Sequence, residues 1–305
     1  MPRQEFRGAP DISDSADPAR FSGGEGFPVS IASHSIPFGL VALIFLLALP
    51  ICAFAGFRFG SLELTRNPAR FVEGKLPGEA SLGALLALLG LLLGFTFSAT
   101  LNWREASVSA VVEEAAALGT AFLRADLLPD AEGRPLQQAL LDYGRTRIVP
   151  PGYRPTRENI DAFVAKSTEA QASLWPATMA ALTPEVPAPV ATFVAGGITE
   201  VLDAHSRRVA AASKSITSGI WMLLTFAAGS GVFIIGNRAA LQGRRLSWRT
   251  MVFSVVLTAV LVTIEDLSRA SDGFSIVPQT PLIAAVADME AALGTAALAS
   301  AAPQP

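Results

Sequence analysis

The chain has few of the residues on which catalytic and metal-binding sites usually depend. Its 305 residues include one cysteine, Cys52, and two histidines, His34 and His205. A single cysteine excludes a disulfide framework and a cysteine-based zinc site. The sequence also has no HExxH motif, no phosphate-binding glycine loop, and no GxSxG motif with a partner histidine. We therefore expect no catalytic residue, no bound metal and no cofactor, and a function other than that of an enzyme.

Charged residues are scarce as well. They make up 16% of the chain, where about a quarter is usual for a soluble domain. The 23 Lys and Arg residues and 26 Asp and Glu residues leave a net charge of −3. A nucleic-acid partner is not expected, because no basic excess is present to neutralise phosphates. Hydrophobic residues make up 51% of the chain, and its mean hydropathy is +0.44. These values predict an integral membrane protein in contact with the lipid bilayer.

Long apolar runs are what the chain does have. Four runs carry no charged residue: 35–57, 80–103, 215–237 and 250–264. The first three exceed the roughly 20 residues that a helix needs to cross the hydrocarbon core. The fourth is shorter and must extend back past Arg249, whose long side chain can reach the interface. A buried soluble helix is the alternative for so short a run. We predict an all-α membrane protein with four transmembrane helices.

The apolar runs divide the chain into five parts. These are a disordered tail (1–34), transmembrane helices 1 and 2 (35–103), a helical bundle outside the membrane (104–214), transmembrane helices 3 and 4 (215–266), and a C-terminal segment and tail (267–305). The tail is rich in Pro, Gly, Ser and Asp and shows no periodicity, which is typical of disorder. Lys and Arg near the spans number eight in the two short loops and five on the opposite side. By the positive-inside rule this count favours short loops in the cytoplasm.

Proline and glycine set the expected helices of the bundle. No proline or glycine lies between Phe95 and Leu118, so the second span is predicted to continue out of the membrane to about residue 128. A helix that opens at Gly133-Arg134-Pro135 and runs to about residue 148 is expected to carry Pro135 in its first turn, where its missing N–H is harmless. Further helices are expected over 157–182 and 281–300. Another helix is expected to begin at residue 190 and to continue without a break into the third span.

The second span contains a row of small residues. Gly83, Ala87, Gly90 and Gly94 share one helix face, and the last two form a GxxxG motif. Small residues let helix backbones approach closely where lipid supplies no hydrophobic drive. The row indicates either ordinary helix packing or packing of several copies around a symmetry axis.

Aromatic and polar residues follow directly. The candidates for lining a pore are Phe95, Phe97, Ser98 and Asn102. Phe95, Ser98 and Asn102 are spaced i, i+3, i+7 and so share a face. Aromatic ring edges carry partial positive charge, and a ring of them around an axis can form an apolar neck that tolerates anions. The alternative is that the two rings are core or interfacial aromatics.

Charged residues on the expected bundle helices are candidates for a polar network. They are Glu113, Glu114, Arg124, Asp126, His205, Arg208, Asp266 and Arg269. Acidic and basic side chains on an otherwise apolar helix are expected to form ion pairs with neighbouring helices of a bundle, so a structural ion-pair network is one interpretation. A permeation path with selective charges is the other. Asp266 either marks the membrane exit of the fourth span or, with Glu265, pairs with Arg269.

These segments resemble the bestrophin-like domain family, whose members are mostly bacterial membrane proteins. The likeness covers about residues 80–290. It lies in Gly94-Phe95-Thr96-Phe97-Ser98, in Val111-Val112-Glu113-Glu114-Ala115 with Gly119-Thr120, in Leu123-Arg124-Ala125 with Leu127-Leu128-Pro129, and downstream in Leu174-Trp175, Glu200-Val201, Asp266, Arg269, Gln279 and Pro281-Leu282. The chain departs from the family pattern at Ala116, where Asn is usual.

The resemblance implies more than the residues do by themselves. Bestrophins are pentameric anion channels with four spans per subunit, an aromatic neck on the second span, and a cytosolic helical region that holds both termini. The resemblance therefore implies a homo-oligomer, a pentamer by this likeness, that conducts small anions such as chloride. It also implies a cytoplasmic bundle in a bacterial inner membrane, against the charge count above. The alternative from another class is a non-conducting membrane interaction or sensory module.

Overall fold

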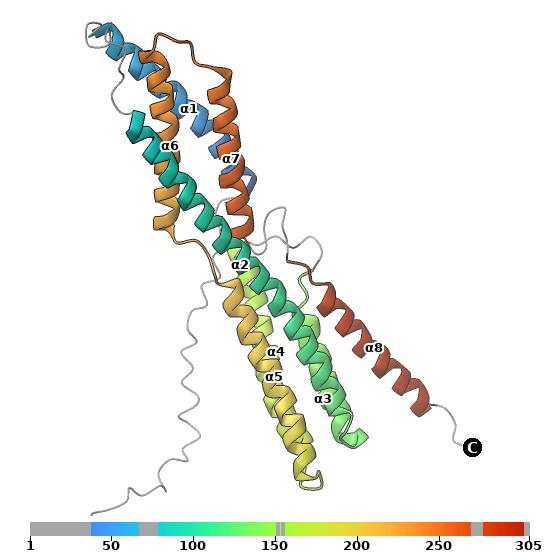
Figure 1. Cartoon of the computed structure of the whole chain (residues 1–305). Helices are drawn as coiled ribbons and strands as arrows, with labels where there is room; N and C mark the ends of the chain where they lie inside the picture. The colour runs from blue at the N-terminus through green and yellow to red at the C-terminus, as the bar shows by residue number, and fades with distance from the viewer. Residues whose placement is uncertain (1–37, 67–78, 151–152, 154–155, 270–276, 302–305) are drawn as a thin grey trace, which may run out of the picture. The chain divides into compact units, whose positions relative to one another are not determined.

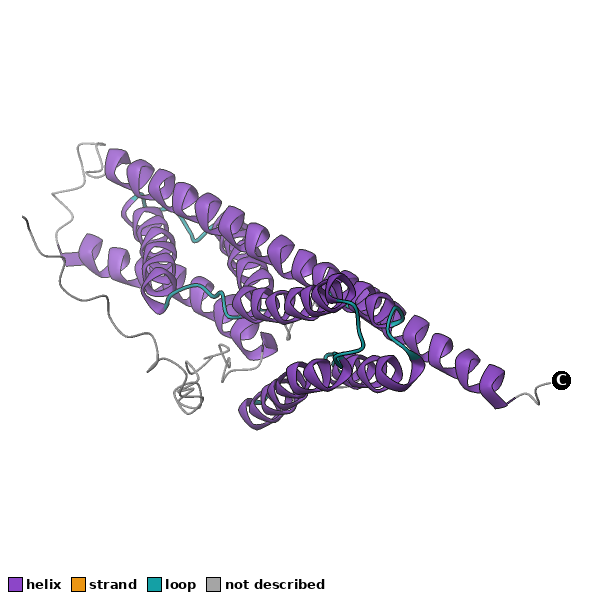
Figure 2. Cartoon of the chain, turned by 90° about the horizontal axis from the view of Figure 1, so that it is seen from below, coloured by secondary structure: helices purple, strands orange, loops and turns teal. Residues whose placement is uncertain are grey.

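The computed structural model describes residues 38–66, 79–150, 153, 156–269 and 277–301, and in these residues every regular element is an α-helix (Figures 1 and 2). The eight helices are α1 (Phe38–Arg66), α2 (Glu79–Ala125), α3 (Asp130–Thr146), α4 (Arg157–Ala181), α5 (Ala188–Ala212), α6 (Ser218–Leu241), α7 (Trp248–Ser268) and α8 (Thr280–Ala301). The all-α prediction is confirmed. The predicted tail 1–34 lies outside the described residues.

Four helices are long and apolar enough to cross a membrane: α1, α2, α6 and α7. Each of them contains all or nearly all of one charge-free run, so the prediction of four spans is confirmed. The short fourth run reaches membrane length because α7 begins at Trp248, before Arg249, and has 21 residues. The hydroxyl of Ser247 accepts a hydrogen bond from the backbone N–H of Arg249 and caps this helix start.

The four spans are held together by close backbone contact and by aliphatic packing. A side-chain carbon added at Gly56 of α1 would overlap the backbone carbonyl of Phe233 on α6, and one at Gly236 would overlap that of Ala53. The two helices therefore touch along their backbones, which only glycine allows. The hydroxyl of Thr258 on α7 donates a 3.2 Å hydrogen bond to the carbonyl of Phe45 and ties α7 to α1.

Helix α2 has 47 residues and is about 70 Å long at about 1.5 Å per residue. It contacts the spans α6 and α7 and also the bundle helices α3, α5 and α8. One side of its C-terminal half packs into a core whose fully buried members include Leu118, Leu136, Leu140, Leu174, Ile198 and Leu282. One helix thus belongs to both parts, as the missing proline and glycine predicted.

Two sequence expectations about helix ends are wrong. Helix α3 begins at Asp130, so Pro135 is its sixth residue rather than part of its first turn. Pro129 precedes the helix in an extended conformation, and the acidic Asp130 and Glu132 suit the positive end of the helix dipole. The prediction that the helix from residue 190 continues without a break into the third span is also wrong.

The chain between α5 and α6 breaks over residues 213–217, where Ser213 caps α5 and Thr217 is extended. Hydroxyl side chains compete for backbone hydrogen bonds and favour caps over helix interiors, which explains the break. Among the described helices, only α2 passes from the spans into the bundle without a break.

Candidate functional site

One face of α2 within the membrane half carries polar and aromatic side chains that no other described helix covers. Phe95, Ser98 and Asn102 are exposed, and the Phe95 ring is 66% exposed. Leu89 and Thr100 are buried on the opposite side of the helix, where α2 meets the other spans. The face therefore points away from the chain's own spans.

Phe97 does not share this face. Two residues along a helix correspond to a rotation of about 200°, so the rings of Phe95 and Phe97 point to different sides. Phe97 is 37% exposed, about half as much as Phe95. Of the two predicted neck aromatics, only Phe95 lies with Ser98 and Asn102.

The row of small residues is also uncovered. Gly83, Ala87, Gly90 and Gly94 are exposed, and a side-chain carbon added at any of the three glycines would meet no described atom within 4 Å. No helix of the described chain packs against the row. It lies beside the Phe95 face, since Gly94 and Ser98 are one turn apart.

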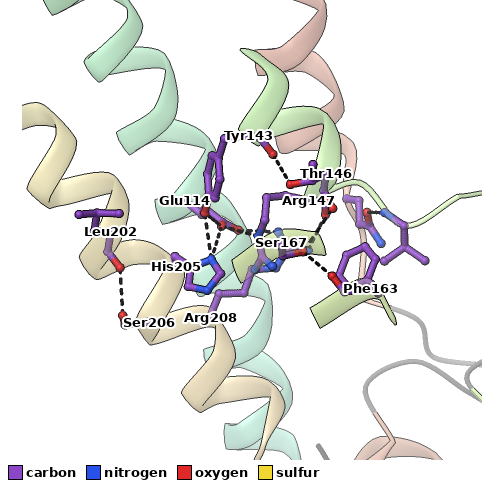
Figure 3. A network of polar contacts seen from close by, with 12 residues as sticks. Glu114, Tyr143, Thr146, Arg147, Phe163, Ser167, Leu202, His205, Ser206 and Arg208 are labelled. Atoms are coloured by element: carbon purple, nitrogen blue, oxygen red, sulfur yellow. Dashed lines mark hydrogen bonds and ion pairs between the residues drawn. The ribbon is translucent and has the colours of Figure 1, made fainter. Parts of the chain in front are cut away.

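A second cluster of polar residues lies in the bundle around Glu114, which is fully buried (Figure 3). Its carboxylate accepts hydrogen bonds from Nε of Arg147 at 2.7 Å, from Nη1 of Arg208 at 2.5 Å and from the hydroxyl of Tyr143 at 2.6 Å. The partners come from α3, from the residue that caps it, and from α5. This network joins three helices at one carboxylate, and its donors favour the ionised form.

His205 completes the network as a neutral side chain. Its Nδ1 lies 3.1 Å from the hydroxyl of Tyr143. Because that hydroxyl donates to Glu114, it accepts from His205, which assigns the proton to Nδ1. Burial lowers the pKa of His205 to about 4, and the nearby charges of Arg147 and Arg208 add to the effect against the opposing attraction of Glu114.

The other predicted network residues form separate, more exposed pairs. Glu113 pairs with Arg207 at 3.2 Å, and Asp126 accepts a 3.4 Å hydrogen bond from Gln137. The guanidinium of Arg124 stacks 4.3 Å from the ring centre of Phe193. These contacts join α2 to α5, and the residue that follows α2 to α3.

Arg124 lies close against α5, beside Gly197. Its Nη2 lies 3.7 Å from the carboxylate of Glu200. A side-chain carbon at Gly197 would lie 2.9 Å from Cδ of Arg124. A side chain at position 197 would therefore force Arg124 to shift from its present place against α5.

At the end of α7, Arg269 and Glu265 form a buried pair, with Nη2 of Arg269 2.7 Å from the carboxylate. Asp266 is buried beside them. The sequence did not single out Tyr143 or Arg147. Tyr143 continues the helical spacing of the buried Leu136 and Leu140, a signal that could have marked it. No cluster of three or more potential metal ligands occurs in the described part of the chain.

Four membrane-length helices, with the second continuing into a helical bundle around a buried ionic network, define an all-α integral membrane protein. A family model described as "Bestrophin-like domain" matches residues 80–282. The match covers more than half of the chain, and the chain belongs to the Bestrophin-like domain family.

Solved structures agree on the fold. Two point variants of a bacterial bestrophin homologue from Klebsiella pneumoniae are similar to this chain. One has a TM-score of 0.57 at 12% identity over 84% of this chain and 98% of that one. The other has a TM-score of 0.56 at 14% identity over 83% and 96%. A comparison with curated proteins gives no significant match.

Proposed function

We propose that the protein is an oligomeric channel for small anions such as chloride, in which α2 of each copy faces a common axis. The observation that carries the proposal is the uncovered face of Phe95, Ser98 and Asn102 on a membrane-spanning helix. Polar side chains within spans usually face a bundle interior or a water-filled cavity rather than lipid. A pore shared between copies would supply that environment.

The small residues beside this face support assembly of several copies. Gly83, Gly90 and Gly94 have open space around them within the described chain, and small residues in spans allow close approach of a second helix. With the row against a neighbouring copy, the adjacent Phe95 face would turn towards the axis.

The absence of acidic side chains from the second span supports an anion as the conducted ion. The run 80–103 contains no carboxylate, whereas rings of Asp or Glu are typical of cation channels. A ring of Phe95 side chains would form an apolar neck that passes weakly hydrated anions and gates by dewetting. Family membership and the bestrophin fold are in keeping with this function.

Flux from reconstituted protein tests the proposal directly. Full-length protein in chloride-loaded liposomes is expected to release chloride, and the same preparation should be a closed oligomer of four or more copies by mass. A folded protein that releases no chloride would contradict the proposal and favour a non-conducting interaction or sensory module.

Substitutions on the α2 face sharpen the test. Phe95→Ala would widen the neck and is expected to raise chloride flux several-fold. Ser98→Asp would place a ring of carboxylates in the pore and reverse the preference from chloride to a small cation, whereas Ser98→Asn should keep it. Phe226→Ala on α6 is the matched control, since this ring is also exposed but lies on another span. Equal responses to Phe95→Ala and Phe226→Ala would argue against a pore at α2.

A further inference from the structure

The network around Glu114 holds more positive than negative charge. Glu114 contributes one negative charge, and Arg147 and Arg208 contribute two positive charges. His205 and Tyr143 are neutral, because burial lowers the pKa of the first and raises that of the second. The cluster therefore carries a net charge of +1 in the interior of the bundle.

Arg147 uses only one of its three guanidinium nitrogens in a hydrogen bond to the described chain. The side chain of Arg147 is only 5% exposed. Its Nε bonds to Glu114, but neither terminal nitrogen donates a hydrogen bond to any residue that the structure describes. Each terminal nitrogen carries two N–H donors, and neither nitrogen is among the fully enclosed unpaired atoms of the described chain, so both remain within reach of a small ion.

Arg208 does not bring the missing negative charge to Arg147, because its own hydrogen bonds go to Glu114 and to a backbone carbonyl. Its Nη1 bonds to Glu114, and its Nη2 donates to the backbone carbonyl of Arg147 at 3.3 Å. The nearest further acid along α2, Glu113, already pairs with Arg207 on the bundle surface. Among the described side chains, the second guanidinium has no carboxylate of its own.

We propose that the terminal nitrogens of Arg147 bind a small monovalent anion, such as chloride or bromide, as a structural counter-ion in the bundle. One monovalent anion cancels the excess of one elementary charge. The low exposure of Arg147 favours a small ion over a phosphate or sulfate, which would also reverse the sign of the cluster. The site is separate from the proposed pore, since Glu114 lies 19 positions along α2 from Phe95.

Thermal unfolding of the full-length protein in detergent tests the site. Chloride is varied against gluconate at constant ionic strength, so that general screening does not change. We expect the unfolding midpoint to rise by about 2–4 °C for each tenfold increase in chloride above the dissociation constant.

Three variants assign the effect to this site. Arg147→Gln makes the cluster neutral and is expected to abolish the chloride dependence. Glu114→Gln raises the net charge to +2 and is expected to lower the half-saturating chloride concentration several-fold. Arg207→Gln, which removes a neighbouring exposed arginine, should keep the dependence unchanged. Full chloride dependence in Arg147→Gln would overturn the proposal, because the ion would then act elsewhere, for example in the pore.

A direct measurement needs no variant. Crystals of the unmodified protein grown in bromide are expected to show an anomalous scattering peak within hydrogen-bond reach of the terminal nitrogens of Arg147. Ordered water at that place without a bromide peak would overturn the proposal even if every variant failed to fold.

Discussion

At the scale of single residues, adjacent glutamates of one helix have different environments. Glu114 is fully buried among two arginines and a tyrosine, whereas Glu113 is exposed and pairs with Arg207. One residue along α2 is a rotation of about 100°, which carries a side chain from the core to the surface. The loss of Glu114 would leave the buried Arg147 and the partly buried Arg208 without an acid, and such losses are strongly destabilising.

The stability of the bundle should depend on pH through His205. Its pKa is about 4 when folded and about 6.5 in an unfolded chain, so the unfolded state binds more protons between these values. The groups that face it are Glu114 on α2, Tyr143 and Arg147 from α3, and Arg208 on α5. Stability is expected to fall as the pH drops from about 6.5 to 4, by up to about 3 kcal/mol.

Thermal unfolding between pH 4 and 7 measures this effect. His205→Gln should flatten the curve over that window, and His34→Gln reports the contribution of the only other histidine. The same slope in His205→Gln and the unmodified chain would contradict the assignment.

At the scale of elements, α1 and α6 are joined by glycine. Their backbones touch at Gly56 and Gly236, where no side chain could fit. Neither helix can slide or rotate against the other without breaking this contact. Lipid offers no hydrophobic drive to hold two apolar helices together, so their association depends on such packing. Close packing is therefore the main force that holds α1 in place.

Gly56→Ala is expected to destabilise the protein by about 1–3 kcal/mol or more, since the added methyl group overlaps the backbone of Phe233. Unfolding in detergent provides the measurement. Gly39→Ala on the same helix is the control, because a side chain there meets nothing within 4 Å. Equal stability of the two variants would show that α1 and α6 are not in contact at Gly56.

At the scale of the whole molecule, the uncovered row on α2 bears on assembly. Gly90→Leu is expected to leave the fold of the single chain intact, because open space surrounds this position, and to weaken the oligomer by keeping neighbouring backbones apart. Mass measurement in detergent together with circular dichroism separates the two effects. An unchanged oligomer would exclude this row from the contact between copies.

The resemblance to bestrophins predicts that the bundle lies in the cytoplasm. In a Cys52→Ala background, a cysteine at exposed Ala172 on α4 is expected to react with a membrane-impermeant reagent only after permeabilisation. A cysteine at Gln242, in the loop between α6 and α7, should react in intact cells. The reverse pattern would support the charge count of the short loops instead.

Much of the helical plan followed from the sequence because its causes are local. Charge-free runs of membrane length predicted the four spans, and the missing proline and glycine predicted the long α2. The break after α5 and the start of α3 were misplaced, since hydroxyl caps and Pro129 act through backbone geometry that apolar spacing does not show.

The sequence by itself thus determined that this is a four-span helical membrane protein with further helices between the second and third spans. Only the tertiary structure decided which side of α2 stays uncovered and which groups meet Glu114. Its partners Tyr143, Arg147 and Arg208 lie 29, 33 and 94 positions away. Their convergence depends on how three helices are rotated about their axes and packed together, and no local pattern of residues specifies that rotation.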